Sequence, residues 1–131
     1  GHPVLIGALD RIRDSYNVNG LGQTAALATL SDIGHYRKQF EHIVQWRTKT
    51  TGSLEALGFE VLPSQANFIF ARPTGITAAE WFQQLRERKI LTRWFDAPKV
   101  RGWLRITIGT ETEMRKFLSA TRAIHRANRL A

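Results

Sequence analysis

An arginine stands in the middle of a strand-like stretch, "WLRITI", at residues 103–108. The leucine and the two isoleucines of this stretch would face one side of a strand, which leaves Arg105 on the other side. A guanidinium is a planar fork of donors that matches a carboxylate or a phosphate in two parallel hydrogen bonds. The pattern therefore makes Arg105 a candidate anion-binding residue. From position alone, a structural ion pair or a solvated sheet face is the commoner use of such an arginine.

Two further polar residues stand in short strand-like stretches. Arg93 lies in "ILTRWF", and Asn67 opens "NFIFAR". Position alone does not separate a binding role from a structural role for Arg93, because its neighbours Trp94 and Phe95 are ordinary strand residues. An asparagine at a strand edge usually forms a turn. Both residues are candidates that need support from elsewhere in the chain.

Other kinds of chemistry find little support in the residue types. The sequence has no cysteine, so disulfides, thiol catalysis and thiolate metal sites are excluded. The four histidines lack metal-ligand spacing: His35 and His42 are two helical turns apart, and no carboxylate completes a set. "NGLG" has neither the lysine nor the preceding strand of a phosphate-binding loop. The sequence therefore predicts no metal site, and the four tryptophans fit a core or an interface better than a base-stacking surface.

Helices are predicted for the first part of the chain. Apolar spacing indicates one helix over residues 4–15 and a second, rich in alanine, over residues 21–30. Ser31 and Asp32 can cap a third, long helix, and Gly58 stands where helices commonly end. The first two helices have no obvious sheet to cover. We therefore expect apolar surface to be left exposed there and the chain to be part of something larger.

The pattern changes after residue 58. "FEVLP", "NFIFAR", "ILTRWF" and "WLRITI" read as short strands. Capping boxes at Thr77 with Glu80, and at Thr110 with Glu113, each open a helix. The last helix carries an apolar face made of Met114, Phe117, Leu118, Thr121 and Ile124. The order strand, strand, helix, strand, strand, helix predicts an α+β fold, with helices over one face of four short, mainly antiparallel strands.

Charge favours anionic partners. Lysine and arginine total 19 against 11 acidic residues, a net charge of +8 in 131 residues. The basic residues are spread along the chain rather than gathered in a block, so solvated helix faces account for most of them and no nucleic acid is expected as a partner. No apolar run reaches the roughly 18 residues that a membrane span needs, and no membrane partner is expected. The composition is compatible with a cytoplasmic protein.

Four segments, taken in order, carry a resemblance to a known family. "RIRDSYNVNGLGQTAALATLSD", "LPSQANFIFAR", "LRERKILTRWFDAP" and "WLRITIGTETEMRKFLSA" resemble the C-terminal part of histidinol-phosphate aminotransferase, a fold-type I enzyme that uses pyridoxal phosphate (PLP). The resemblance implies that Arg105 grips anionic groups of the substrates. It implies that Arg93 contributes to the phosphate end of histidinol phosphate, and that Asn67 lies close to the active site.

The resemblance also implies an organisation. Residues 1–57 would be a helical segment connecting from the PLP-binding domain, and residues 58–131 would be the small C-terminal domain. The family's PLP lysine, and its other cofactor-binding residues, match positions before this chain begins. None of the five lysines here has a family-like context, so the chain alone is expected to bind no PLP and to be inactive. The intact enzyme would be a cytoplasmic homodimer that moves an amino group between histidinol phosphate and 2-oxoglutarate.

Three alternatives stay open on the sequence. The parent could be another PLP-dependent aminotransferase, or a decarboxylase that acts on an amino-acid phosphate, because the strand arginine would serve there too. A basic α+β module that binds nucleic acid on its sheet comes from a different class, although no RNA-binding signature is present. The third alternative is a stand-alone structural or regulatory remnant.

Overall fold

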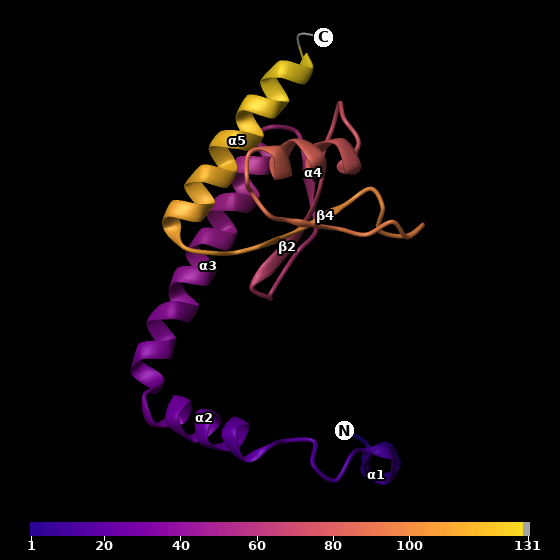
Figure 1. The fold of residues 1–131 in the computed structure, drawn as a ribbon, viewed down its shortest axis with the longest axis vertical. Coiled ribbons are helices and arrows are strands. Elements are labelled where there is room, and N and C mark those ends of the chain that lie inside the picture. The colour runs from indigo at the N-terminus through magenta and orange to yellow at the C-terminus, as the bar shows by residue number, and fades with distance from the viewer. Residues whose placement is uncertain (130–131) are drawn as a thin grey trace. The chain divides into compact units, whose positions relative to one another are not determined.

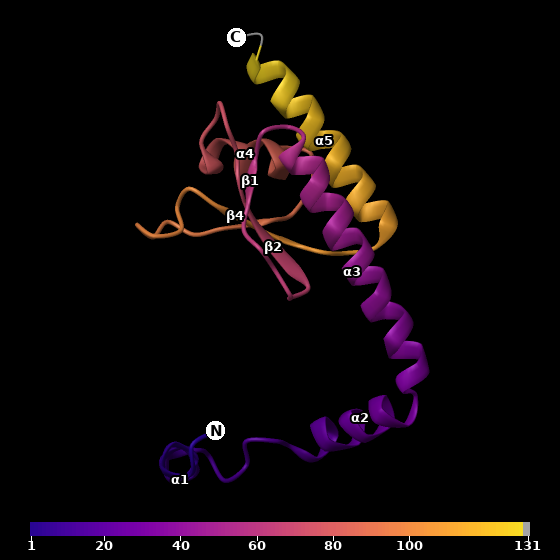
Figure 2. The same ribbon diagram turned by 180° about the vertical axis from the view of Figure 1, so that it is seen from behind.

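A computed structural model describes residues 1–129 (Figures 1 and 2). Its internal contacts divide the chain into two units, residues 1–38 and the residues from Gln39 onward. The division falls inside helix α3 (Ile33–Glu55). The sequence suggested a boundary between residues 57 and 58. The contacts divide the chain earlier because the second half of α3 buries Trp46 and Leu54 in the core of the second unit.

The first unit is helical. Helix α1 spans Pro3–Ile12, and helix α2 spans Gly20–Ser31. The side chain of Asn19 caps α2 by accepting a hydrogen bond of 2.8 Å from the backbone N–H of Gly22. Neither helix contains a buried residue. The expected exposed apolar surface is present, and its large side chains are Val4, Leu5, Ile6, Leu9, Ile12, Leu21, Leu27 and Leu30.

The start of α3 differs in part from the sequence prediction. The hydroxyl of Ser31 donates to the carbonyl of Leu27, so Ser31 belongs to the end of α2 and does not cap α3. The Asp32 carbonyl accepts from the backbone N–H of His35 and thereby begins α3. The prediction failed at Ser31 because a serine in a last helical turn can bond back to the carbonyl four residues earlier.

A four-stranded sheet lies in the second unit. Its strands are β1 (Glu60–Val61), β2 (Phe68–Arg72), β3 (Arg93–Trp94) and β4 (Leu104–Thr107). The order across the sheet is β1-β2-β4-β3, and every neighbouring pair is antiparallel. With its helices, this sheet gives the α+β fold predicted from the sequence.

Both capping boxes form. Thr77 and Glu80 exchange side-chain and backbone hydrogen bonds at the start of α4 (Ala78–Glu87). Thr110 and Glu113 do the same at the start of α5 (Glu111–Arg129). Each box satisfies backbone N–H groups that have no partner inside the helix, so both predicted helix starts are confirmed.

One face of the sheet carries the core. Ile69 and Ala71 of β2, with Leu104 and Ile106 of β4, alternate toward this face and are at most 3% exposed. The second half of α3 and α5 lie side by side across it, and α4 contacts both β3 and α5 (Figures 1 and 2). The apolar face predicted for the last helix is buried as expected: Met114, Phe117, Leu118, Thr121 and Ile124.

All four strands are shorter than the stretches predicted from the sequence, and β1 and β3 lose the most residues. At the start of both β1 and β3, the first residue of the expected strand forms a hydrogen bond with the end of the preceding helix instead. The N–H of Phe59 bonds the Leu54 carbonyl at the end of α3, through Gly58 at a φ of 81°. The N–H of Ile90 bonds the Leu85 carbonyl at the end of α4. Strand pairing therefore begins only after these closing turns.

A glycine joins β4 to α5. A β-carbon placed at Gly109 would lie 2.5 Å from a carboxylate oxygen of Glu113. That carboxylate cannot move away freely, because it accepts hydrogen bonds of 2.7 Å from the backbone N–H and from the hydroxyl of Thr110. The exit from β4 therefore needs glycine for as long as the capping box is kept.

None of the helices within residues 1–129 is both long enough and apolar enough to cross a membrane.

The burial of the core predicts that alanine substitution at two leucines has very different effects on stability. Leu54 is 0% exposed and Leu91 is 84% exposed. Leu54→Ala should lower the free energy of unfolding by about 2 to 5 kcal/mol, because it leaves a cavity in a packed core. Leu91→Ala is the matched control and should change it by less than about 0.5 kcal/mol. Urea denaturation of the two variants measures both values, and equal effects would contradict the core described here.

The second capping box predicts a pH dependence. The hydrogen bonds from Thr110 hold the pKa of Glu113 below its ordinary value. A carboxylate with a lowered pKa in the folded state stabilises the fold above its unfolded pKa, and this contribution is lost as the pH falls through the folded pKa. Thr110→Ala should therefore raise the pKa of Glu113 toward its ordinary value and flatten the loss of stability in acid. An NMR titration of Glu113, with Glu80 as the internal control, tests this; an unmoved pKa would contradict it.

Candidate functional site

The second face of the sheet is not covered by the helices of its unit, and it brings two of the predicted residues together. Arg105 of β4 lies directly opposite Phe70 of β2 on one side and opposite Arg93 of β3 on the other. Residues directly opposite each other in an antiparallel pair project to the same face of the sheet. The guanidinium groups of Arg105 and Arg93 therefore share this face, which we call the open face.

Arg105 is half-buried and lacks an ionic partner. Its guanidinium carbon lies 5.1 Å from the centre of the Phe68 ring, within the range of a cation–π contact. Its Nε is buried without a hydrogen-bond partner. No ion pair formed within residues 1–129 includes Arg105. Within the described part of the chain, Arg105 therefore does not form the structural ion pair that its position alone suggested.

Arg72 shows what a structurally paired arginine looks like on the same face. It lies directly opposite Glu60 of β1 and forms an ion pair with that carboxylate. Its guanidinium also rests over the Trp103 ring, with 5.0 Å between the guanidinium carbon and the ring centre. The sheet thus supplies a carboxylate to Arg72 at the end of β2, and within residues 1–129 it supplies none to Arg105. This contrast leaves the Arg105 guanidinium available to an anion.

Arg93 is exposed and adds a second positive charge. Its guanidinium carbon lies 5.0 Å from the centre of the Phe95 ring. Like charges directly opposite each other in a sheet destabilise it. An oxyanion held between Arg93 and Arg105 would remove that repulsion and would fill the donors of both forks. The pair can therefore bind a carboxylate or a phosphate that enters from the open side.

Asn67 lies at one end of the same ladder. Its backbone carbonyl accepts a hydrogen bond of 2.8 Å from the N–H of Ile108, and its side chain is exposed. It precedes Phe70 by three residues, which is roughly 10 Å along a strand. By strand alternation an odd spacing of three residues puts Asn67 and Phe70 on opposite faces, so the structure does not bring Asn67 together with the two arginines.

Sequence reasoning missed two supporting residues. One is Phe68, whose ring lies under the guanidinium of Arg105. The alternation of β2 places Phe68 on the open face, but only the register between β2 and β4 shows which arginine it contacts. Arg47 of α3 donates a hydrogen bond of 2.7 Å to the carbonyl of Ala66 and so holds the loop before Asn67. Its signal in the sequence is weak, because an arginine beside the buried Trp46 looks like an ordinary helix-surface residue.

Comparisons with known proteins identify the family of this chain. The family model described as aminotransferase class I and II matches residues 1–120, so the chain belongs to that family. Within the family, the chain is 45% identical over 123 residues to the histidinol-phosphate aminotransferase of Gluconacetobacter diazotrophicus. This match covers 92% of the chain and 35% of the relative. The chain spans about one third of the length of the curated relatives it matches.

Solved structures show the same fold. The histidinol-phosphate aminotransferase of Clostridium acetobutylicum superposes with a TM-score of 0.78 at 21% identity, covering 95% of this chain and 38% of that one. The enzyme of Sinorhizobium meliloti, solved in complex with pyridoxal-5'-phosphate, gives a TM-score of 0.73 at 22% identity, covering 98% and 35%. The predicted α+β small-domain fold is therefore confirmed.

The chain has five lysines, all of them exposed, and none lies in a strand of the open face: Lys38, Lys49, Lys89, Lys99 and Lys116. Within residues 1–129 no group of histidine, aspartate and glutamate side chains could hold a metal ion. The open face can therefore bind an anion, and the described residues offer it no metal site.

The support from Arg47 predicts a local loosening. Arg47→Met should free the loop before Asn67 and speed hydrogen exchange of the Ile108 amide about tenfold, because the strand pairing next to this loop loses an anchor. Arg101→Met is the control, since the Arg101 side chain is 60% exposed and sits 3.9 Å from Asp96. Amide exchange followed by NMR measures both. Unchanged exchange at Ile108 in Arg47→Met would show that the loop holds without this hydrogen bond.

Proposed function

We propose that this chain forms the substrate-anion-binding part of a PLP-dependent aminotransferase that moves an amino group between L-histidinol phosphate and 2-oxoglutarate. Family membership supports the reaction class, and the named relatives support the substrate. The observation that carries the proposal is the half-buried Arg105, whose Nε lacks a hydrogen-bond partner within the described chain.

The two substrates share the chemistry that this face can recognise. Histidinol phosphate carries a phosphate, and 2-oxoglutarate carries two carboxylates. A single guanidinium can hold either group through two parallel hydrogen bonds, so one site can serve both halves of the reaction in turn. In this proposal Arg105 is the main anion ligand, Arg93 adds a donor at the phosphate end, and Asn67 binds substrate close to them from the turn before β2.

The ring of Phe68 has a positioning role in this proposal. It lies under the guanidinium of Arg105 at a distance of 5.1 Å and restricts the side chain from below. A cation already held in place loses less conformational entropy when the anion binds. The short strand adds to this effect, because a strand fixes its side chains more firmly than a loop does.

The rest of the chemistry belongs to other parts of the parent protein in this proposal. PLP, held by a lysine outside this chain, would supply the electron sink for the reaction. Residues 1–57 would connect to that PLP-binding domain, and residues 58–131 would be the small domain. The chain alone would be inactive, and the parent would be a cytoplasmic homodimer.

A different PLP-dependent aminotransferase, or a decarboxylase of an amino-acid phosphate, would also need an anion-binding arginine. The names of the closely similar relatives favour histidinol phosphate over those substrates. Nucleic-acid binding on the open face is disfavoured by the match of the family model to residues 1–120.

Substitution of Arg105 in the intact parent tests the proposal. Arg105→Ala should raise KM and lower kcat/KM for histidinol phosphate by the equivalent of about 2 to 4 kcal/mol, because a charge-assisted contact to a desolvated anion is lost. Arg105→Lys should fall between Arg105→Ala and the unmodified enzyme, since it keeps the charge but not the fork. Steady-state kinetics with histidinol phosphate, and with aromatic and aliphatic amino acids, measure the effect.

Arg115→Ala is the matched control. Arg115 is an exposed arginine of α5 that pairs with Glu111 four residues earlier, and its removal should leave kcat/KM nearly unchanged. An unchanged efficiency in Arg105→Ala would remove the anion-binding role. Equal efficiency with substrates that lack the phosphate would instead refute histidinol phosphate as the substrate.

A further inference from the structure

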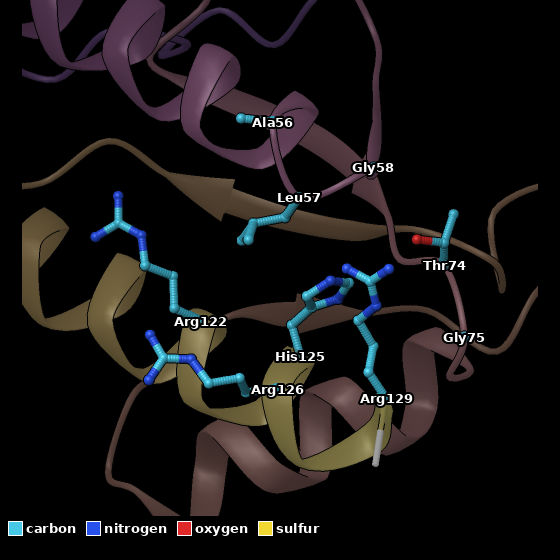
Figure 3. Close-up of a pocket in the computed structure, with 9 residues that line it drawn as sticks. All are labelled: Ala56, Leu57, Gly58, Thr74, Gly75, Arg122, His125, Arg126 and Arg129. Carbon is cyan, nitrogen blue, oxygen red and sulfur yellow. The ribbon is translucent and has the colours of Figure 1, made fainter. Parts of the chain in front are cut away.

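A second basic site lies away from the open face, at the end of α5. A cavity of about 620 Å³ is lined by four residues of one face of α5, by the turn after α3 and by the loop after β2 (Figure 3). Its volume is in the range of small-ligand sites. The lining residues from α5 are Arg122, His125, Arg126 and Arg129. From this cavity we infer a binding site for a small phosphate-bearing anion.

The spacing on α5 gathers positive charge on one face of the helix. The four residues follow the i, i+3, i+4, i+7 pattern, which places their side chains in one stripe. Figure 3 shows His125 and Arg129 next to each other and facing Thr74, while Arg122 and Arg126 extend on the other side of Leu57. Among residues 1–129, no aspartate or glutamate lines the cavity. The described part of its wall therefore concentrates positive charge.

The dipole of α5 does not account for this stripe. Cations are favoured at a helix C-terminus, but the effect falls off within the last turn. Arg126 and Arg129 lie in that turn, whereas Arg122 and His125 lie before it. Like charges four residues apart, such as Arg122 and Arg126, destabilise a helix. An anion bound between such side chains would offset the repulsion between their positive charges.

The first half of α5 shows how an arginine on a helix surface is commonly neutralised. There Arg115 pairs with Glu111 at a distance of 2.6 Å, in the i, i+4 arrangement that stabilises a helix surface. The ion pairs formed within residues 1–129 include none of the four cavity residues. The stripe is thus built without carboxylate partners of the kind that Arg13, Arg72, Arg101 and Arg115 have.

The walls of the cavity suit a phosphate group better than a nucleic acid or an extended peptide. Thr74 offers a hydroxyl, and Gly75 and Gly58 present backbone without a side chain, so an anion can approach closely. The His125 ring is fixed edge-on against the buried Phe59, with 5.7 Å between the ring centres. No phenylalanine, tyrosine or tryptophan lines the cavity, so it offers no base-stacking platform. Phosphate oxygens can accept hydrogen bonds from the guanidinium groups, from the hydroxyl and from the imidazole.

Titration of the chain with inorganic pyrophosphate, followed by NMR, tests the inference. We expect saturable shifts at the Gly58 and Gly75 amides and at the His125 ring. Arg122→Gln combined with Arg126→Gln and Arg129→Gln should weaken binding about tenfold or more, because charge-assisted hydrogen bonds are lost. The control combines Arg86→Gln with Arg88→Gln, two exposed arginines at the end of α4, and should leave the affinity within about twofold.

A second variant guards against an indirect effect of the triple change. Thr74→Glu puts a carboxylate into the cavity wall opposite His125 and Arg129 and should abolish the shifts without touching α5. Arg105→Ala should leave the shifts intact, which separates this site from the one on the open face. Shifts spread evenly over all the arginines, or binding unchanged in the triple variant and in Thr74→Glu, would overturn the inference. Tighter binding of a glutamate-rich peptide than of pyrophosphate at these residues would also overturn it.

Discussion

The alternation of side chains along β4 is the constraint on which the site depends. Leu104 and Ile106 are buried against the helices, so Arg105 between them has to project to the opposite face. A slip of one residue would drive the guanidinium into an apolar core, at a cost far above any gain from pairing. Core packing therefore fixes the register, and the register in turn sets Arg105 opposite Arg93. Two positive charges meet there because the hydrophobic core leaves them no other place.

The features that the sequence predicted correctly are those that depend on near neighbours. The capping boxes at Thr110 and Thr77, the apolar face of α5 and the alternation of β4 each follow from spacings of two to four residues. The prediction that Ser31 caps α3 failed because a backbone carbonyl within α2 competed for the same hydroxyl. The late starts of β1 and β3 were not predictable either, since the closing hydrogen bond of the preceding helix takes the first residue of each expected strand.

The candidate site was predictable in its central residue and not in its surroundings. The motif around Arg105 singled out the arginine, but its platform, Phe68, follows only from the pairing of strands that are more than thirty residues apart in the chain. The loop anchor, Arg47, comes from a helix that gives no sign of touching the sheet. A single sequence reveals a charged side chain more readily than the contacts that hold it. Those contacts decide whether the charge is presented rigidly to a ligand.

The glycine after β4 has a consequence for how this family is detected. Gly109 is required by the carboxylate of Glu113, and that carboxylate is required by the start of α5. Within "ITIGTETE", Gly109, Thr110 and Glu113 therefore form the joint between a strand and a helix. A match confined to this segment reports shared architecture, whatever molecule each protein handles. Discrimination between substrates has to be sought in side chains that take no part in this joint, such as Arg105 and Thr107 on the open face.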